Sequence, residues 1–193
     1  FTLVRRWRFQ NKRKIIMYLP PILRHQKKLG QVIFTAGDYN LNVIAIRRGD
    51  NVDDLAVVYL LRGKWRVEWF SISTEPTPQY LENPVNRKGA AILALGQYRS
   101  AYAAGLHKGR PALVQVGEVT VHRDNDGDSV PNTKTTPTES GFFGINIHDK
   151  RGGSAGCILS TVTTVARLRD LLSHQTIHGH GDRFTLTLIQ GAR

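Results

Sequence analysis

The 193-residue chain is poor in cysteine, in acidic residues and in long apolar runs. With the single cysteine Cys157 the chain can form no internal disulfide, so cysteine usage leaves the redox compartment open. Since no apolar run reaches the roughly 18 residues that a spanning helix needs, we expect no transmembrane segment. The chain has 15 acidic residues and 27 Lys and Arg residues, and the resulting formal net charge of +12 predicts an anionic partner. Nucleic acid, anionic lipid and the anionic polymers of a cell envelope all qualify.

Acidic residues are absent altogether from residues 1–28, which carry nine Lys or Arg interleaved with aromatic and aliphatic side chains. We predict that residues 1–30 form a basic arm outside the core, in which Pro20-Pro21 stops any helix. The arm suits phosphates and bases, a partner protein, or an anionic surface. None of the common nucleic-acid-binding motifs is present, which favours docking onto a protein or surface.

The remainder, residues 31–193, is predicted to be one mostly β domain, a β-rich α+β sandwich or barrel. Short apolar segments recur about every ten residues with turn residues between them, which is typical of antiparallel β structure. One longer segment has the apolar spacing of a helix, at 161–173. The expected strands are 32–34, 41–46, 55–61, 65–70, 96–98, 112–116, 119–122 and 184–189.

The stretch from Gly141 to Ser160 concentrates the chemistry of the chain. Alternating apolar residues at 143, 145 and 147 predict a strand that ends at His148, with the imidazole on the face opposite the isoleucines. A glycine-rich loop follows. Cys157 would then lie close to the junction between this loop and the helix.

Such a junction would activate a thiol. A helix N-terminus and a nearby imidazole both lower a thiol pKa, so we predict Cys157 as nucleophile and His148 as its base. The backbone amides of Gly156 and Cys157 would hold an oxyanion, and Gly156 would let a substrate approach. Ser154 or a backbone carbonyl of the loop would orient the imidazole. The alternative is a buried structural cysteine, which is common for free thiols.

At these residues the sequence resembles the L,D-transpeptidase catalytic domains, which carry a strand-end His, a loop and a Ser/Thr-His-Gly-Cys motif. Ile147-His148 matches the first element and Ser154-Ala155-Gly156-Cys157 the second, while Gly96-Gln97-Tyr98 keeps part of an upstream strand motif. Ala155 replaces the second histidine, His148 is only nine residues from Cys157, and the usual Arg or Asn after the cysteine is missing.

The chain also looks like phage and bacterial proteins that share a Gly-Ile-Asn-Ile-His … Ser-Ala-Gly-Cys signature. The resemblance implies a β-rich fold with its main helix after the cysteine, and acyl transfer on peptidoglycan peptides. Beside the catalytic residues we predict Tyr98, Asn146 and Ser160 as substrate-binding residues.

Other groups of residues in the sequence give weaker support for a metal site. Asp53-Asp54 is more typical of a turn than of a metal site. The acidic loop Asp124-Asn125-Asp126-Gly127-Asp128 opens like a calcium loop but lacks the closing Glu. The histidines at 174, 178 and 180 have no Cys or carboxylate at ligand spacing. We therefore predict no metal and no cofactor.

Two loops and two further histidines could border the site. Residues 71–89, rich in Pro, could border a substrate groove, and residues 132–140 are a candidate lid. His107 and His122 could join the site across the sheet, although a half-exposed surface histidine is the more common case.

Two functions remain open from the sequence. The first is a cysteine-dependent transpeptidase or endopeptidase of peptidoglycan in the cell envelope or a phage virion. The second is a non-enzymatic virion or surface component that keeps the fold and uses its basic arm for assembly with other proteins. The missing motif histidine favours the second, whereas the retained His148 and Cys157 favour the first.

Overall fold

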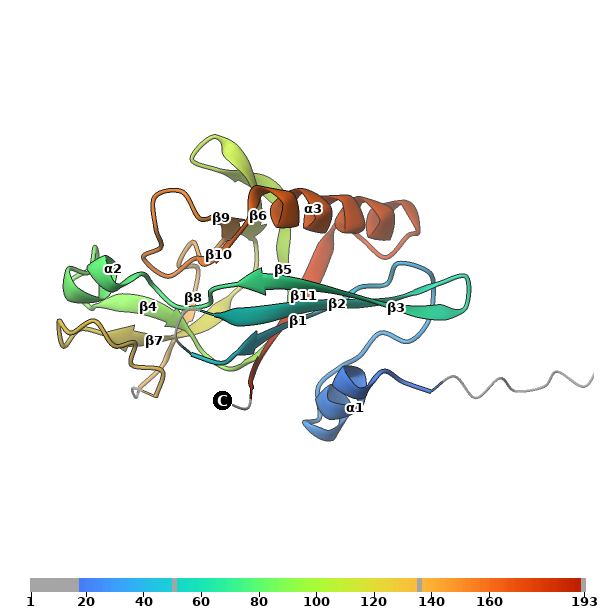
Figure 1. The fold of residues 1–193 in the computed structure, drawn as a ribbon, viewed down its shortest axis with the longest axis horizontal. Coiled ribbons are helices and arrows are strands. Elements are labelled where there is room, and N and C mark those ends of the chain that lie inside the picture. The colour runs from blue at the N-terminus through green and yellow to red at the C-terminus, as the bar shows by residue number, and fades with distance from the viewer. Residues whose placement is uncertain (1–17, 50–51, 135–136, 192–193) are drawn as a thin grey trace, which may run out of the picture.

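The computed structural model describes residues 18–49, 52–134 and 137–191 and confirms a mostly β fold with one main helix. An eight-stranded sheet and a three-stranded sheet share the chain with helices α1 (Pro21–Lys28), α2 (Pro78–Glu82) and α3 (Val162–Ile177) (Figure 1). Within the described ranges no helix is long and apolar enough to span a membrane. The predictions for residues 1–17 lie outside the described residues.

The large sheet has the strand order β10-β9-β6-β5-β11-β1-β2-β3. Short connections join the antiparallel pairs β1–β2, β2–β3 and β5–β6, while β1 and β11, the first and last strands of the described residues, pair in parallel. Just beyond β3, Ser73 exchanges two backbone hydrogen bonds with Leu159 of β10, so the two edges of the curled sheet meet. The strands are β1 (Asn42–Arg47), β2 (Asp53–Leu61), β3 (Lys64–Ile72), β5 (Gly96–His107), β6 (Arg110–Gln115), β9 (Ile147–Asp149), β10 (Ile158–Ser160) and β11 (Arg183–Gln190).

Helix α3 covers the inner face of this sheet. Thr161 caps its N-terminus by accepting a hydrogen bond from the Thr164 backbone amide, as a β-region N-cap residue does. Its buried side chains at 165, 168, 171 and 172 join the main core, which confirms the helix predicted from 161 and extends it to Ile177.

Helix α1 covers the outer face and corrects the prediction of an arm outside the core. Pro21 begins the helix instead of preventing it, because a proline at the first helical position loses no hydrogen bond. Leu23 is fully buried against Ile44 and Val58, and Gln26 donates to the Thr187 hydroxyl at 2.9 Å. The domain therefore begins before residue 31.

The small sheet, β4 (Ala90–Leu93), β7 (Val119–Asp124) and β8 (Glu139–Gly141), lies beside α2 at one end of the molecule (Figure 1). Two strand predictions were wrong. Residues 32–34 are irregular because Phe34 bonds the Asn42 side chain instead of a strand. The strand expected from Phe143 to His148 is split, and only Ile147–Asp149 is extended into the sheet.

Asp53, predicted as part of a turn, is instead a buried acceptor at the start of β2. Its carboxylate accepts hydrogen bonds from the Arg48 amide at 2.7 Å and from the Thr74 amide and hydroxyl at 2.8 and 2.6 Å. The hydroxyl and carbonyl oxygens of Thr74 in turn accept hydrogen bonds from the guanidinium of Arg47. Arg47 is only 2 % exposed, and its Nε lies 3.8 Å from Glu75 Oε1. Burial lowers the pKa of Arg47, and Glu75 and Asp53 oppose that change.

Candidate active site

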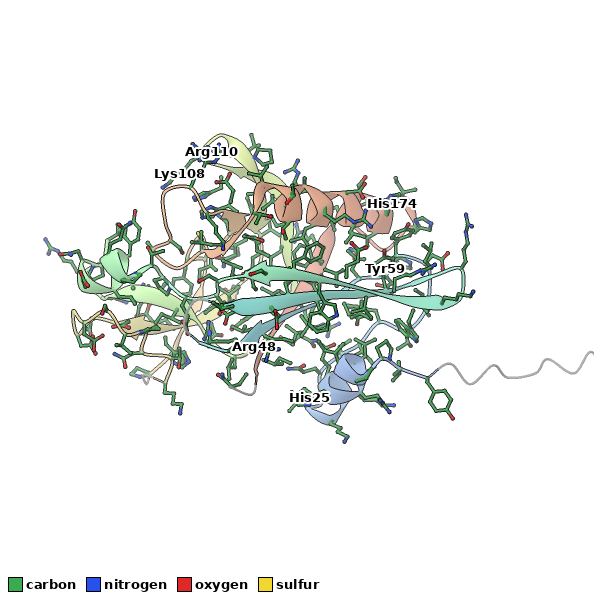
Figure 2. All side chains as sticks on the ribbon, in the orientation of Figure 1. His25, Arg48, Tyr59, Lys108, Arg110 and His174 are labelled. Atoms are coloured by element: carbon green, nitrogen blue, oxygen red, sulfur yellow. The ribbon has the colours of Figure 1, made fainter. Side chains whose placement is uncertain are left out.

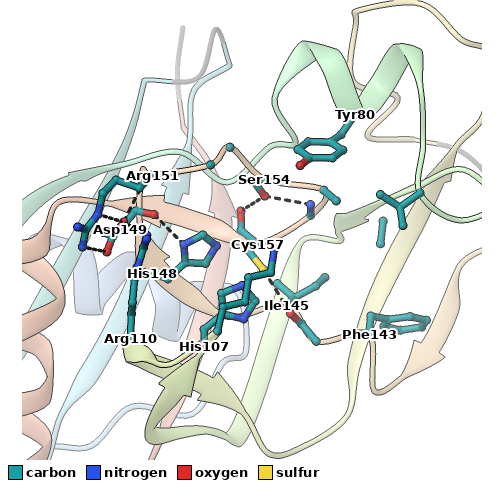
Figure 3. Close-up of a pocket in the computed structure, with 18 residues that line it drawn as sticks. Tyr80, His107, Arg110, Phe143, Ile145, His148, Asp149, Arg151, Ser154 and Cys157 are labelled. Carbon is teal, nitrogen blue, oxygen red and sulfur yellow. Dashed lines mark hydrogen bonds and ion pairs between the residues drawn. The ribbon is translucent and has the colours of Figure 1, made fainter.

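A cleft of about 520 Å³ opens between the two sheets and contains both His148 and Cys157 (Figure 3). Its walls come from the β5–β6 turn, residues 143–145, β9 and the loop 151–157, with Tyr80 of α2 and Val85 on the far side. The loop 71–89 thus borders the cleft as predicted. The described residues of 132–140 do not line it, so the lid prediction fails for them.

Cys157 lies at the end of the glycine-rich loop, but it does not begin a helix. The short strand β10 follows it directly, and α3 starts only at Val162. The half-buried thiol donates to the Gly144 carbonyl at 3.3 Å, and its sulfur accepts from the Asn146 amide at 3.4 Å.

The environment of this thiol overturns the prediction of a lowered pKa. Burial raises the pKa of Cys157, and the Asn146 amide and the charge of Lys108 offset this only in part. The helix N-terminus that should have lowered the pKa is separated from the sulfur by β10. The resting group is therefore a neutral thiol, which needs a base.

Ser154 and Gly156 shape the turn that presents Cys157. The buried Ser154 hydroxyl donates to the Cys157 carbonyl at 2.6 Å and accepts from the Gly156 amide at 3.0 Å. Gly156 has a φ of +146°, and a Cβ there would lie 2.4 Å from the Ala91 carbonyl oxygen. Gly156 thus permits contact with the chain itself instead of a substrate, and its amide is already engaged. The Cys157 amide has no hydrogen-bond partner among the described residues, so it remains available to donate to an oxyanion.

His148 occupies the middle of β9 and is 8 % exposed. Its Nδ1 lies 2.7 Å from the Asp149 carbonyl oxygen, which can only accept, so Nδ1 carries the proton of the neutral ring. Nε2 is then the free base. Of the two orienting groups that the sequence left open, the backbone carbonyl holds the imidazole, and Ser154 holds the turn.

His107, at the end of β5, joins the site, which the sequence analysis named as the less common of its two possible placements. Its ring stacks on that of His148 with centroids 4.6 Å apart. Asn146 Oδ1 accepts from the Gln115 amide at 2.9 Å, so its Nδ2 is the group that donates to His107 Nδ1, also at 2.9 Å. The proton of neutral His107 is therefore on Nε2. Burial lowers the pKa of His107, helped by His148 and by the adjacent Lys108.

These three side chains form a compact cluster. One nitrogen of His107, one nitrogen of His148 and the sulfur of Cys157 all lie within 4.8 Å of one another. The cluster is the one group of three or more His, Cys, Asp or Glu side chains in the described structure that meets this distance. The acidic loop at 124–128 does not form such a group, and its carboxylates accept hydrogen bonds from nearby loop residues, including Asn132.

The rim of the cleft is basic. Lys108 and Arg110 project from the β5–β6 turn (Figure 2), and Arg151 lies on the opposite loop. Arg151 forms a two-pronged pair with Asp149 at 2.8 and 3.0 Å, which holds the pKa of that carboxyl well below its usual range. With the one carboxylate of the lining neutralised, the cleft has an excess of positive charge.

Two of the predicted substrate-binding residues do not line the cleft. The Tyr98 hydroxyl donates to the Ala94 carbonyl at 2.5 Å inside the core, and the fully buried Ser160 donates to the Ser71 carbonyl at 3.1 Å. Both therefore support the sheet. Asn146 does lie at the site, where its amide and side chain position Cys157 and His107.

The remaining predicted histidines lie elsewhere. His122 is in β7 of the small sheet. His174 and His178 pack on the ring of Tyr39. His174 lies near the end of α3 that is far from Lys108 and Arg110 (Figure 2).

Gln115 was missed entirely, although it organises the segment from Gly141 to Ile145. Its side-chain oxygen accepts from the Phe143 and Ile145 amides, and its side-chain nitrogen donates to the Gly117 and Gly141 carbonyls. Nothing in the local sequence of a glutamine at a strand end signals such a role.

Comparison of this chain with protein-family models, with curated proteins and with solved structures finds no match. The L,D-transpeptidase assignment therefore remains a resemblance of short motifs.

Proposed function

We propose that the protein is a cysteine-dependent acyl-transfer enzyme, a transpeptidase or endopeptidase, that acts on the peptides of peptidoglycan. The observation that carries this proposal is the orientation of His148 by the Asp149 carbonyl, with one nitrogen of the imidazole within 4.8 Å of the Cys157 sulfur inside a cleft. A thiol, a base and a group that orients the base form the minimal unit of nucleophilic catalysis.

The chemistry starts from a neutral thiol, because burial raises the Cys157 pKa. His148 Nε2 takes the thiol proton as the sulfur attacks an amide carbonyl, and the Cys157 amide donates to the resulting oxyanion. His148 then protonates the leaving amine, which leaves a thioester on Cys157. An incoming amine resolves the thioester in transpeptidation, and water resolves it in hydrolysis.

The charge of the cleft favours an anionic substrate. Lys108 and Arg110 border the nucleophile, and Asp149 is already paired with Arg151. A peptide with free carboxylates, such as a peptidoglycan stem, would be attracted to this rim. The net charge of +12 suits the same envelope polymer.

Mass spectrometry of purified murein after incubation with the protein tests the proposal. We expect new crosslinked or cleaved peptides with the native protein, none with Cys157→Ala, and a large loss with His148→Ala. The double variant should be scarcely worse than either single one, because the two residues act as one unit.

His122→Ala is the matched control, since this histidine lies in β7 and does not line the cleft. If murein is unchanged by the native protein, or if Cys157→Ala retains the turnover, the enzymatic proposal fails. An unreactive thiol in the folded protein would then favour the structural component.

A further inference from the structure

We propose that His107, His148 and Cys157 form a binding site for Zn²⁺ or a similar borderline divalent cation. The ligand atoms lie within 4.8 Å of one another and come from three separate parts of the chain, β5, β9 and the glycine-rich loop. Two imidazoles and a thiolate are ligand types that zinc prefers. The atoms would close by about 1 Å around an ion with bonds of roughly 2.0–2.3 Å. The fourth position would face the cleft.

His148 already has the arrangement of a metal ligand. Metal-bound histidines usually donate their second N–H to a carbonyl or carboxylate, and His148 Nδ1 donates to the Asp149 carbonyl at 2.7 Å. Its Nε2 then carries a free lone pair, and one nitrogen of this ring lies within 4.8 Å of the other two ligand atoms.

The hydrogen bonding of His107 is less favourable for a metal ligand, and we expect it to limit the affinity of the site for the ion. Asn146 donates to His107 Nδ1, which places the ring proton on Nε2. Binding through Nε2 requires the proton to move to Nδ1, where the Asn146 side chain offers a donor and no acceptor. A carboxylate at position 146 would accept from both the Gln115 amide and His107 Nδ1–H. We therefore expect Asn146→Asp to tighten metal binding, by about tenfold on the scale of outer-ligand effects.

Metal binding and acyl transfer would exclude each other at this site. The Cys157 thiol loses its proton to solvent when the sulfur binds the ion, and the His148 lone pair that would serve as base is used as a ligand. This regulatory consequence rests on the proposed function, whereas the binding itself does not.

Titration with Co²⁺, a spectroscopic substitute for Zn²⁺, tests the site without any activity measurement. The native protein should develop a thiolate-to-cobalt absorption band in the near ultraviolet, which Zn²⁺ abolishes by displacement. Binding should release one proton, measured in weakly buffered solution. Cys157→Ala should lose the band, and His107→Ala and His148→Ala should each weaken binding at least tenfold. The control His122→Ala should bind as the native protein does.

The outcomes separate the two proposals. Prior alkylation of Cys157 in the native protein must also abolish the band, so that the result does not depend on the folding of a variant. Absence of a band, or equal binding by His107→Ala and native protein, overturns the metal site. A protein that binds Co²⁺ but leaves murein unchanged retains the metal site and loses the proposed enzyme. Turnover of murein without a band retains the enzyme alone.

Discussion

The buried carboxylate of Asp53 offers a sharp test of how the structure is stabilised. Asp53→Ala removes an acceptor that three groups share, the Arg48 amide and the Thr74 amide and hydroxyl. It also removes negative charge near the buried Arg47. Buried donors left without an acceptor cost about 1–3 kcal/mol each, and breaking a buried charge pair costs about 3–5 kcal/mol. Because Glu75 remains beside Arg47 and the Thr74 hydroxyl can rotate, we expect a loss of about 3–4 kcal/mol in the free energy of unfolding.

The neighbouring carboxylate provides the matched control. Asp54 pairs with Arg48 at the surface, where its side chain is 37 % exposed, so Asp54→Ala should cost no more than about 1 kcal/mol. Urea unfolding followed by the fluorescence of Trp65 and Trp69 on β3 measures both variants. Equal losses for the two variants would refute the view that Asp53 stabilises the fold through this buried network.

Three further predictions concern the site and the charge. The rate of Cys157 alkylation should rise only above the pH of about 8.5 that is usual for a free thiol, because burial raises the Cys157 pKa. Lys108→Ala should move this alkylation profile to still higher pH. An inflexion well below pH 8.5 in the native protein would contradict a raised thiol pKa. The raised thiol pKa contributes stability below that value, which is lost as pH rises through the folded pKa. Gly156→Ala places a Cβ against the Ala91 carbonyl and should lower murein turnover at least tenfold, with circular dichroism as the fold control. Binding to an anionic polymer should weaken steeply as the salt concentration rises, and deleting residues 1–17 should make this salt dependence less steep. A salt dependence unchanged by the deletion would exclude residues 1–17 as a contributor to the binding.

Local signals in the sequence were sufficient for most elements of the fold. Short apolar segments between turn residues predicted the strands that became β1, β2, β3 and β11, and helical spacing predicted α3. These segments bury side chains at regular positions, so the spacing of their apolar residues can be recognised in the sequence. Residues 32–34 have a similar composition but are held by the Asn42 side chain, a contact that no local pattern reveals.

The residues of the candidate site also differ in whether the sequence could identify them. His148 and Cys157 could be identified because both lie in one glycine-rich stretch of unusual composition. His107 could be named only as one of two histidines that could join the site, since it lies 41 residues before His148 and the two rings meet only through the pairing of β5, β6 and β9. A lone histidine in a turn has the same local sequence whether it faces solvent or another ring.

The sequence by itself therefore determined the β-rich class, the helix that follows the cysteine and the closeness of one thiol and one imidazole. Only the tertiary structure decided the state of that thiol. The short strand β10 separates Cys157 from α3 and removes the influence of the helix N-terminus, while burial raises the thiol pKa. A pKa depends on the dielectric and the charges that surround a group in three dimensions, and these come from residues distant in the chain.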